Sequence, residues 1–352
     1  MAARELLARL ESQPCFAELH VDASLSRKDL LEQVAGAPKA RQLRLWLDNG
    51  VFQSASELAE LLQACYEHLG AVARQEKLPI FEDMSVLPNL GAGSGRAPPC
   101  QFRGEKFDYV VLGGTFDRLH VGHKVLLTVA AVMAQRGLAI GVSGPPLLRE
   151  KAGASILQDW GERAATVVDF LAVLRPDLQV RVEELEDAFG PALWPEMGAL
   201  VVSAETEAGG AAVNVRRQEK NSPQLHVVAV PLVASAGGKV SSTTARELDS
   251  LAAAIEACWA MVPEAGRARR WLPLLLALAR QAVQGERDLA QSLLGLGAAK
   301  ESGPGWAAAA RCLELAPVGL GLLQAVAADV GWDEMTVTRI RHELGTDVPS
   351  RL

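Results

Sequence analysis

The chain has 352 residues, of which 35 are Lys or Arg and 42 are Asp or Glu, so its formal net charge is −7. Its 49% of hydrophobic residues can build buried cores, which excludes a largely disordered protein, and the acidic balance argues against a nucleic-acid binder. No apolar run approaches the ~20 residues of a membrane span. The five cysteines stand singly and the first residues mix Arg with Glu, so we expect reduced thiols, no targeting leader and a cytoplasmic protein.

Residues 1–88 are expected to form a mainly helical module of unknown function. The capping box S-A-S-E precedes an apolar-periodic run that ends near Arg74, which predicts a helix. The segment QLRLWL (42–47) alternates like a strand but could also close a helix. Residues 1–100 carry no catalytic motif, so we expect them to be dispensable for chemistry. A linker is expected over 89–106, because it begins with the Gly-, Ser- and Pro-rich stretch NLGAGSGRAPPC.

Residues 107–250 show short β-branched runs separated by helical patterns. The expected strands are 108–114, 138–144, 179–185, 199–205 and 225–232, and the clearest helices are 120–136 and 160–175. Alternating strands and helices predict an α/β fold with a doubly wound, Rossmann-like, five-stranded parallel sheet. Residues 251–352 are rich in Ala and Leu and predict a helical C-terminal region. No P-loop motif occurs in the chain, so no kinase domain is expected there.

The segment GGTFDRLHVGH (113–123) follows the first of these strands. Its glycines permit a tight turn, and a helix that begins near Leu119 brings backbone N–H groups to an anion site. His120 and His123 share one face of the helix start and can donate to phosphate oxygens, while Gly122 removes a side chain between them. The alternative is a pair of ordinary surface histidines, but placement after a strand and before a helix favours the phosphate site.

The segment GGKVSSTTAR (237–246) has the same character. Lys239 follows two glycines, and hydroxyl side chains stand where the next helix should start, which favours phosphate. A simple N-cap cluster is the alternative, and this motif taken alone does not separate the two.

Together these motifs resemble those of the H-x-G-H nucleotidyltransferase superfamily, and within it the eukaryotic and archaeal type of phosphopantetheine adenylyltransferase. Two further elements carry the same resemblance: GPPLLREK followed by ILQDWGER (144–163), and VVSAETEAGGAAVNVRR (201–217). The likeness covers about residues 107–248. It departs from the family pattern around residues 149–151, where Lys151 rather than Arg149 is taken to face the pocket.

The resemblance implies transfer of AMP from ATP, with Mg²⁺, to 4′-phosphopantetheine. It implies catalytic roles for His120, His123 and Lys239. The implied ATP-binding residues are Gly113, Gly114, Thr115, Phe116, Gly122, Ser241, Ser242, Thr243 and Arg246. The implied substrate-binding residues are Thr115, Lys151, Arg163 and Arg217. No side chain is assigned as a metal ligand; Asp117 is interpreted as a helix cap, with a role beside Mg²⁺ as the alternative.

Two other functions remain open on the sequence. The chain could be another H-x-G-H nucleotidyltransferase that uses CTP or ATP with a different phosphate acceptor. It could also be a non-catalytic binding module on the same fold. ATP and 4′-phosphopantetheine are the expected partners, and the sequence identifies no protein partner for the helical flanks.

Overall fold

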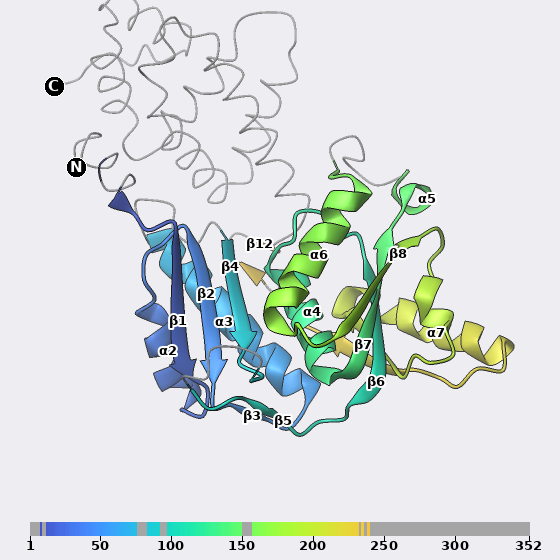
Figure 1. Ribbon diagram of the computed structural model, residues 1–352, viewed down its shortest axis with the longest axis horizontal. Helices are drawn as coiled ribbons and strands as arrows, with labels where there is room; N and C mark the ends of the chain where they lie inside the picture. Colours follow the sequence, from blue (N-terminus) through green and yellow to red (C-terminus); the bar gives the residue numbers. More distant parts are fainter. Residues whose placement is uncertain are drawn as a thin grey trace, which may run out of the picture. The chain divides into compact units, whose positions relative to one another are not determined.

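The computed structural model describes residue 8 and residues 12–75, 83–91, 97–149, 157–231, 234–235 and 238–239. The chain divides into two compact units, and nearly all described residues belong to the unit made of Cys15–Ala73 and Phe81–Thr243 (Figure 1). The predicted helical region 251–352 lies outside the described residues. Among those described, no helix is long and apolar enough to cross a membrane.

The larger sheet of this unit has five parallel strands in the order β10-β9-β6-β7-β8. The strands are β6 (Phe107–Gly114), β7 (Ala134–Ser143), β8 (Gln179–Leu185), β9 (Ala199–Ser203) and β10 (His226–Val230). All five predicted strands and the parallel sheet are confirmed. The chain runs outward from β6 through β7 to β8 and then returns to β9, so β6 and β9 meet at the point where the winding reverses. Ligands of doubly wound sheets bind at that point, beyond the carboxyl ends of the strands.

Both faces of this sheet are covered. Val110, Val111 and Leu112 are consecutive in β6 and all buried, although alternate side chains point to opposite faces. One face packs against α7 and a short 3-10 helix, η2, and the other against α4 and α6. These elements are α4 (Val121–Met133), α6 (Trp160–Leu174), η2 (Gly190–Leu193) and α7 (Glu207–Glu219).

Helix α4 is the most enclosed of these helices. From Lys124 to its last residue every position is buried, and after Lys124 all of them except Thr128 are apolar. It contacts β6, β7 and β9 of the large sheet, α6 beside it, and β4 (Asp83–Pro88) of the N-terminal module. The helix that opens with the two predicted histidines is therefore held by both halves of the unit.

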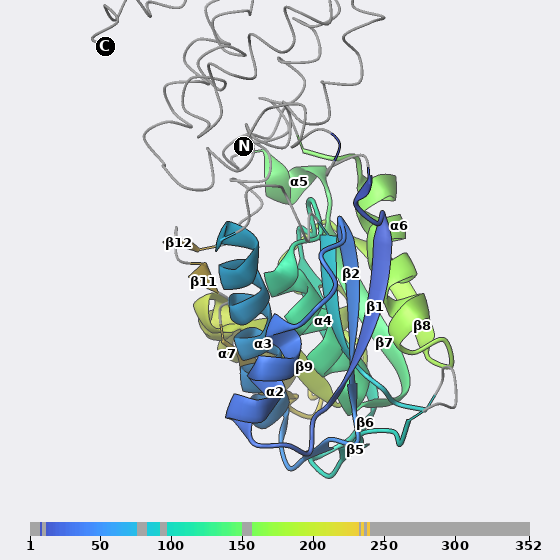
Figure 2. The same cartoon turned by 90° about the vertical axis from the view of Figure 1, so that its left-hand side faces the viewer.

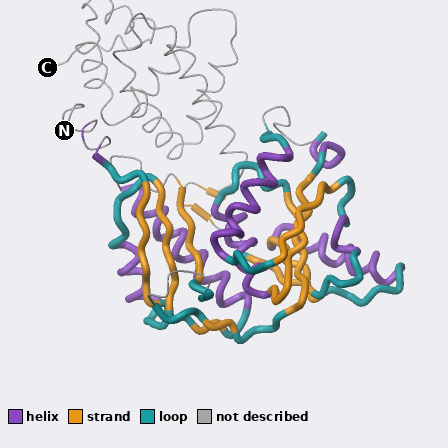
Figure 3. The backbone as a smooth tube through the Cα atoms, in the orientation of Figure 1, coloured by secondary structure: helices purple, strands orange, loops and turns teal. Residues whose placement is uncertain are grey.

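The N-terminal module is built on a second parallel sheet, so the expectation of a mainly helical module is incomplete. Strands β1 (Phe16–Asp22), β2 (Gln42–Asp48) and β4 pair in the order β1-β2-β4, which makes residues 42–47 a strand. Helices α2 (Arg27–Ala35) and α3 (Ala55–Gln75) lie on one face of these strands (Figure 2). Figure 3 shows both sheets in one view. The helix predicted after S-A-S-E is confirmed as α3.

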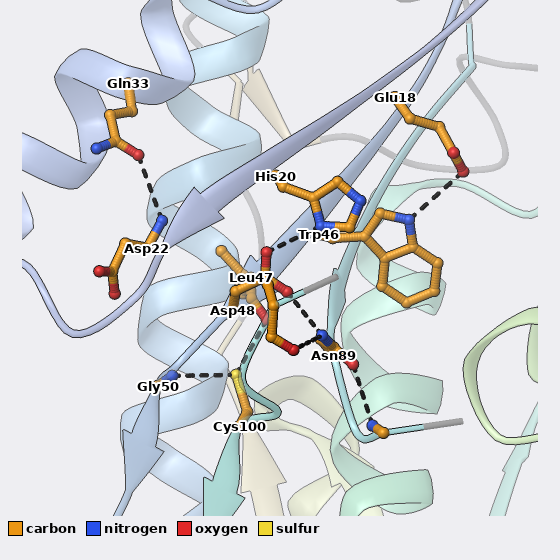
Figure 4. A network of polar contacts seen from close by, with 12 residues as sticks. Glu18, His20, Asp22, Gln33, Trp46, Leu47, Asp48, Gly50, Asn89 and Cys100 are labelled. Atoms are coloured by element: carbon orange, nitrogen blue, oxygen red, sulfur yellow. Dashed lines mark hydrogen bonds and ion pairs between the residues drawn. The ribbon is translucent and has the colours of Figure 1, made fainter. Parts of the chain in front are cut away.

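The described ends of the predicted linker 89–106 are packed onto this module rather than free (Figure 4). Asn89 donates from Nδ2 to Asp48 Oδ1 at 2.8 Å, and the Cys100 thiol donates to the carbonyl oxygen of Leu47 at 3.0 Å. The next two residues form β5 (Gln101–Phe102), which pairs with β3 (Val51–Phe52). Residues 92–96 lie outside the described part. The linker prediction is therefore wrong for these described ends, because their polar groups bond to β2.

Three cysteines lie in the described part of the chain, and all three are free: Cys15 is exposed, and Cys65 and Cys100 are buried. Burial raises the pKa of Cys65 to about 12 and that of Cys100 to about 11, so both stay neutral near pH 7.

Candidate active site

The turn after β6 brings the backbone into a conformation that side chains rarely adopt. Phe116 (φ 53°) and Arg118 (φ 46°) both lie in the left-handed region, two residues apart. Such backbone persists where the surroundings hold it in place, and it occurs often at functional sites. Helix α4 begins at Val121 with His120 as its N-cap, slightly later than the predicted start near Leu119.

His120 and His123 stack on one another at the first turn of α4. Their ring centroids are 3.8 Å apart and their planes differ by 22°. Phe116 is fully buried, and the centroid of its ring lies 5.2 Å from that of His123. The two imidazoles therefore form one unit at the N-terminus of a helix, where the free N–H groups and the helix dipole favour an anion.

Gly122 leaves room for the ring of His120. A Cβ at this position would lie 3.2 Å from both Cε1 and Nδ1 of His120, which is tighter than an ordinary contact. The space that the missing side chain leaves is bordered by the His120 ring, and the implied contact of Gly122 with ATP stays a prediction.

Arg163 holds the carboxyl ends of two strands together. Its side chain is buried and donates to three carbonyl oxygens: Thr115 after β6 (2.7 Å), Ser143 at the end of β7 (3.0 Å), and Gln158 (3.0 Å). Burial lowers the pKa of the guanidinium, and the carboxylates of Asp117, Asp159 and Glu184 oppose that shift. Arg163 lies at the predicted site, but as a fixed positive charge that positions the loop.

Gln158 is a residue whose role the sequence did not reveal. Its side-chain Oε1 accepts a hydrogen bond from the backbone N–H of Arg118 (2.6 Å), and its backbone N–H donates to Asp117 Oδ1 (2.9 Å). Both carboxylate oxygens of the fully buried Asp117 also accept from the Arg118 guanidinium. Asp117 therefore braces the loop, and its interpretation as a helix cap is wrong. The nearest signal in the sequence was the family-like element ILQDWGER, which contains both Gln158 and Arg163.

Arg217 lies at the amino edge of the sheet, where the parallel strands begin, and not at the carboxyl edge, where they end. Its assignment to a phosphate pocket is therefore wrong. It is fully buried and donates to the carbonyl oxygens of Ala192 (2.7 Å), Trp194 (2.9 Å), Met197 (3.5 Å) and Pro223 (2.6 Å). These residues precede β9 and β10, at their amino ends. The physical reason is the length of α7: Arg217 follows Glu207 by ten residues, and at ~1.5 Å per residue the helix has carried it about 15 Å from the carboxyl edge.

The glycines and Thr115 of the first motif lie at the carboxyl edge as predicted. Gly113 and Gly114 end β6, and the Gly114 carbonyl accepts from the Ser143 hydroxyl at 3.2 Å. Arg149 follows the short helix α5 (Pro145–Leu148) and is exposed. Lys239 belongs to β12 (Gly238–Lys239), which pairs with β11 (Ala234–Ser235). The other predicted residues lie outside the described part: Lys151, Ser241, Ser242, Thr243 and Arg246.

Comparison of the sequence with known proteins identifies the family of this chain. No protein-family model matches the chain. An uncharacterised protein of Schizosaccharomyces pombe and a phosphopantetheine adenylyltransferase of Saccharomyces cerevisiae are each 38% identical, over 146 and 152 residues. These matches cover 39% and 41% of this chain and 46% and 49% of the relatives, so they span about half the length of each relative. The phosphopantetheine adenylyltransferase of Methanopyrus kandleri is 38% identical over 143 residues, which make up 40% of this chain and 90% of that protein. The chain belongs to the phosphopantetheine adenylyltransferase family.

Family membership covers only part of the chain. Nine-tenths of the archaeal phosphopantetheine adenylyltransferase aligns with two-fifths of this chain, so most of this chain has no counterpart in that relative. Strand β4 of the N-terminal sheet contacts the helix that carries His120 and His123.

Proposed function

We propose that the protein transfers AMP from ATP to the phosphate of 4′-phosphopantetheine, giving dephospho-coenzyme A and pyrophosphate, a step of coenzyme A biosynthesis. Membership of the family supports this reaction. The structural observation that carries the proposal is the stacked pair His120–His123 at the N-terminus of α4, beyond the carboxyl end of the central strand. We expect the reaction to take place in the cytoplasm, with no nucleic-acid substrate.

The chemistry requires positioning and charge stabilisation more than proton transfer. A phosphate oxygen of the acceptor attacks the α-phosphorus of ATP, the new P–O bond forms, and the bond to the bridging oxygen breaks with its electron pair leaving on pyrophosphate. An acceptor phosphate is largely ionised near pH 7, so no general base is needed. His120 and His123 supply donors to the oxygens on which charge develops, and the N-terminus of α4 adds its partial positive charge.

The surrounding residues hold these donors in place. Arg163 fixes the backbone of the loop at Thr115, and Gln158 fixes it at Arg118. We expect ATP to enter as its Mg²⁺ complex, so the metal is part of the substrate; the Asp117 carboxylate is already bonded to Arg118 and Gln158 and does not fit a metal ligand. Contacts of Lys151, Lys239, the hydroxyls of 241–243 and Arg246 with phosphates stay predictions.

Pyrophosphate release by the full chain tests the proposal. ATP and CTP are each combined with 4′-phosphopantetheine, with pantetheine, which lacks the attacking phosphate, and with unrelated phosphate monoesters. We expect release with ATP and 4′-phosphopantetheine and none with pantetheine. Release that requires CTP or another phosphate acceptor would assign a different nucleotidyltransferase. ATP binding in calorimetry without any release would indicate a non-catalytic module.

A further inference from the structure

The N-terminal module makes a polar contact with the helix that carries the imidazole pair. Lys124 follows His123 in α4, and its side chain is only 6% exposed. Its ammonium forms an ion pair with the Asp83 carboxylate and donates to the Met84 carbonyl oxygen (2.9 Å) and the Ser85 hydroxyl (3.1 Å). An ammonium has three N–H donors, and all three acceptors here belong to β4. Lys124 is therefore directed at the N-terminal module rather than at a substrate.

The strand that receives Lys124 is itself fixed. β4 pairs in parallel with β2 along its whole length, and its Val86 N–H donates to the hydroxyl of Tyr66 on α3 at 2.9 Å. Tyr66 is buried, so the hydroxyl and the strand hold one another inside the module. A displacement of β4 would therefore involve the whole three-stranded sheet and α3.

The other end of the contact is the first turn of α4. The backbone N–H of Lys124 donates to the carbonyl oxygen of His120 at 3.1 Å, the hydrogen bond that closes this turn. One residue thus bonds through its backbone to His120 and through its side chain to β4. The two residues whose rings are stacked are His120, which accepts this hydrogen bond, and His123, which precedes its donor in the chain.

We propose that the N-terminal module sets the position of the His120–His123 pair through Lys124, which makes Lys124 a positioning residue and Asp83 and Ser85 its supports. The inference rests on the proposed function for its kinetic consequences. It replaces the expectation that residues 1–100 are dispensable for chemistry. A buried ammonium without a counter-charge would move toward water, and α4 would carry both imidazoles with it.

The test compares carboxylate-to-amide variants of two N-terminal residues: Asp83 pairs with Lys124 of α4, and Glu18 pairs within the module. Asp83→Asn removes the counter-charge of Lys124. Glu18→Gln is the matched control, because Glu18 pairs with Arg44 between β1 and β2 at 3.0 Å. For Asp83→Asn and for Lys124→Met we expect kcat to fall ~tenfold with KM for ATP changed less than about twofold, and Glu18→Gln to match the wild type. The kcat of the double variant Asp83→Asn/Lys124→Met should be no lower than that of Lys124→Met alone, because both substitutions remove the same interaction.

A second measurement separates this inference from the assignment of the reaction. The ring signals of His120 and His123 in the NMR spectrum of the substrate-free full chain should shift in Asp83→Asn, and more weakly in Ser85→Ala, but not in Glu18→Gln. If the wild type fails to use 4′-phosphopantetheine while these signals shift, the reaction is wrong and the positioning inference stands. If Asp83→Asn does not fold, Ser85→Ala decides. Unchanged ring signals and unchanged kcat in the folded variants would overturn the inference.

Discussion

The two edges of the five-stranded sheet each hold a buried arginine that donates to backbone carbonyl oxygens. At the carboxyl edge Arg163 joins the ends of β6 and β7, where the loop that leads to the imidazole pair begins. At the amino edge Arg217 joins the segments that lead into β9 and β10. Both side chains have their guanidinium pKa lowered by burial. The same residue type with the same bonding thus serves the site at one edge and the scaffold at the other.

The difference between the edges lies in what surrounds each arginine. Around Arg163 the backbone has two left-handed residues, Phe116 and Arg118, and the turn leads into the N-terminus of α4. Around Arg217 the chain enters strands, and its carbonyl oxygens are satisfied by the guanidinium. An arginine in a sequence motif can therefore be assigned to a binding site or to the scaffold only once the structure shows at which edge of the sheet it lies.

The largest effect should come from the imidazole pair. In the proposed reaction, His123→Ala removes a donor to the oxygens on which charge develops, so we expect kcat to fall about 10²–10³-fold in steady-state assays. His226→Ala is the control at the amino edge. His226 is the first residue of β10, its side chain is half exposed, and its ring centroid lies 5.4 Å from that of Phe107. A near-normal kcat for His123→Ala, or an equal loss for His226→Ala, would remove the distinction between the two edges.

The next effect concerns stability at the amino edge. Arg217→Lys leaves three donors where a planar fork now reaches four carbonyl oxygens, so we expect the free energy of unfolding to fall by about 2–3 kcal/mol. Faster hydrogen exchange in β9 and β10 should report the loss. KM for 4′-phosphopantetheine should stay unchanged. A tenfold rise in that KM with normal hydrogen exchange would return Arg217 to the phosphate pocket.

At the carboxyl edge the same substitution should act on turnover. Arg163→Lys loses the fork that holds Thr115, Ser143 and Gln158, so the loop loses its fixed position. We expect kcat to fall ~tenfold with a smaller change in KM for 4′-phosphopantetheine, measured in the same assay as Arg217→Lys. A raised KM with normal kcat would show instead that Arg163 binds the acceptor phosphate directly.

The large sheet and the first motif could be predicted because local sequence determines them. Buried parallel strands are nearly continuous apolar runs, and a strand, two glycines and a helix in succession place the motif. The sheet of the N-terminal module escaped prediction because β1 (FAELHVD) is an edge strand with mostly unburied side chains, so it lacks such a run. Gln158 and Lys124 could not be assigned because their partners lie about 40 residues away in sequence.

The smallest effect should come from Gly122, and it sharpens the comparison because propensity and geometry act in opposite directions there. Alanine in a helix is favoured over glycine by roughly 1 kcal/mol, so Gly122→Ala should slightly stabilise an isolated helix. In this chain the new Cβ would lie 3.2 Å from the His120 ring, so the ring must shift by a few tenths of an ångström against its stack with His123. We therefore expect kcat to fall a few-fold while the melting temperature is unchanged or slightly higher.

Gly161 provides the matched control for this substitution. It is the second residue of α6, as Gly122 is of α4, and a Cβ there would meet the side chain of its own N-cap residue, Asp159 Oδ1, at 3.2 Å. Gly161→Ala involves the same gain in propensity and a similar local contact but no imidazole. Equal kinetics for the two variants would show that the stacked arrangement of His120 and His123 has no influence on turnover. A loss of kcat confined to Gly122→Ala, without loss of stability, would show that the ring geometry itself matters.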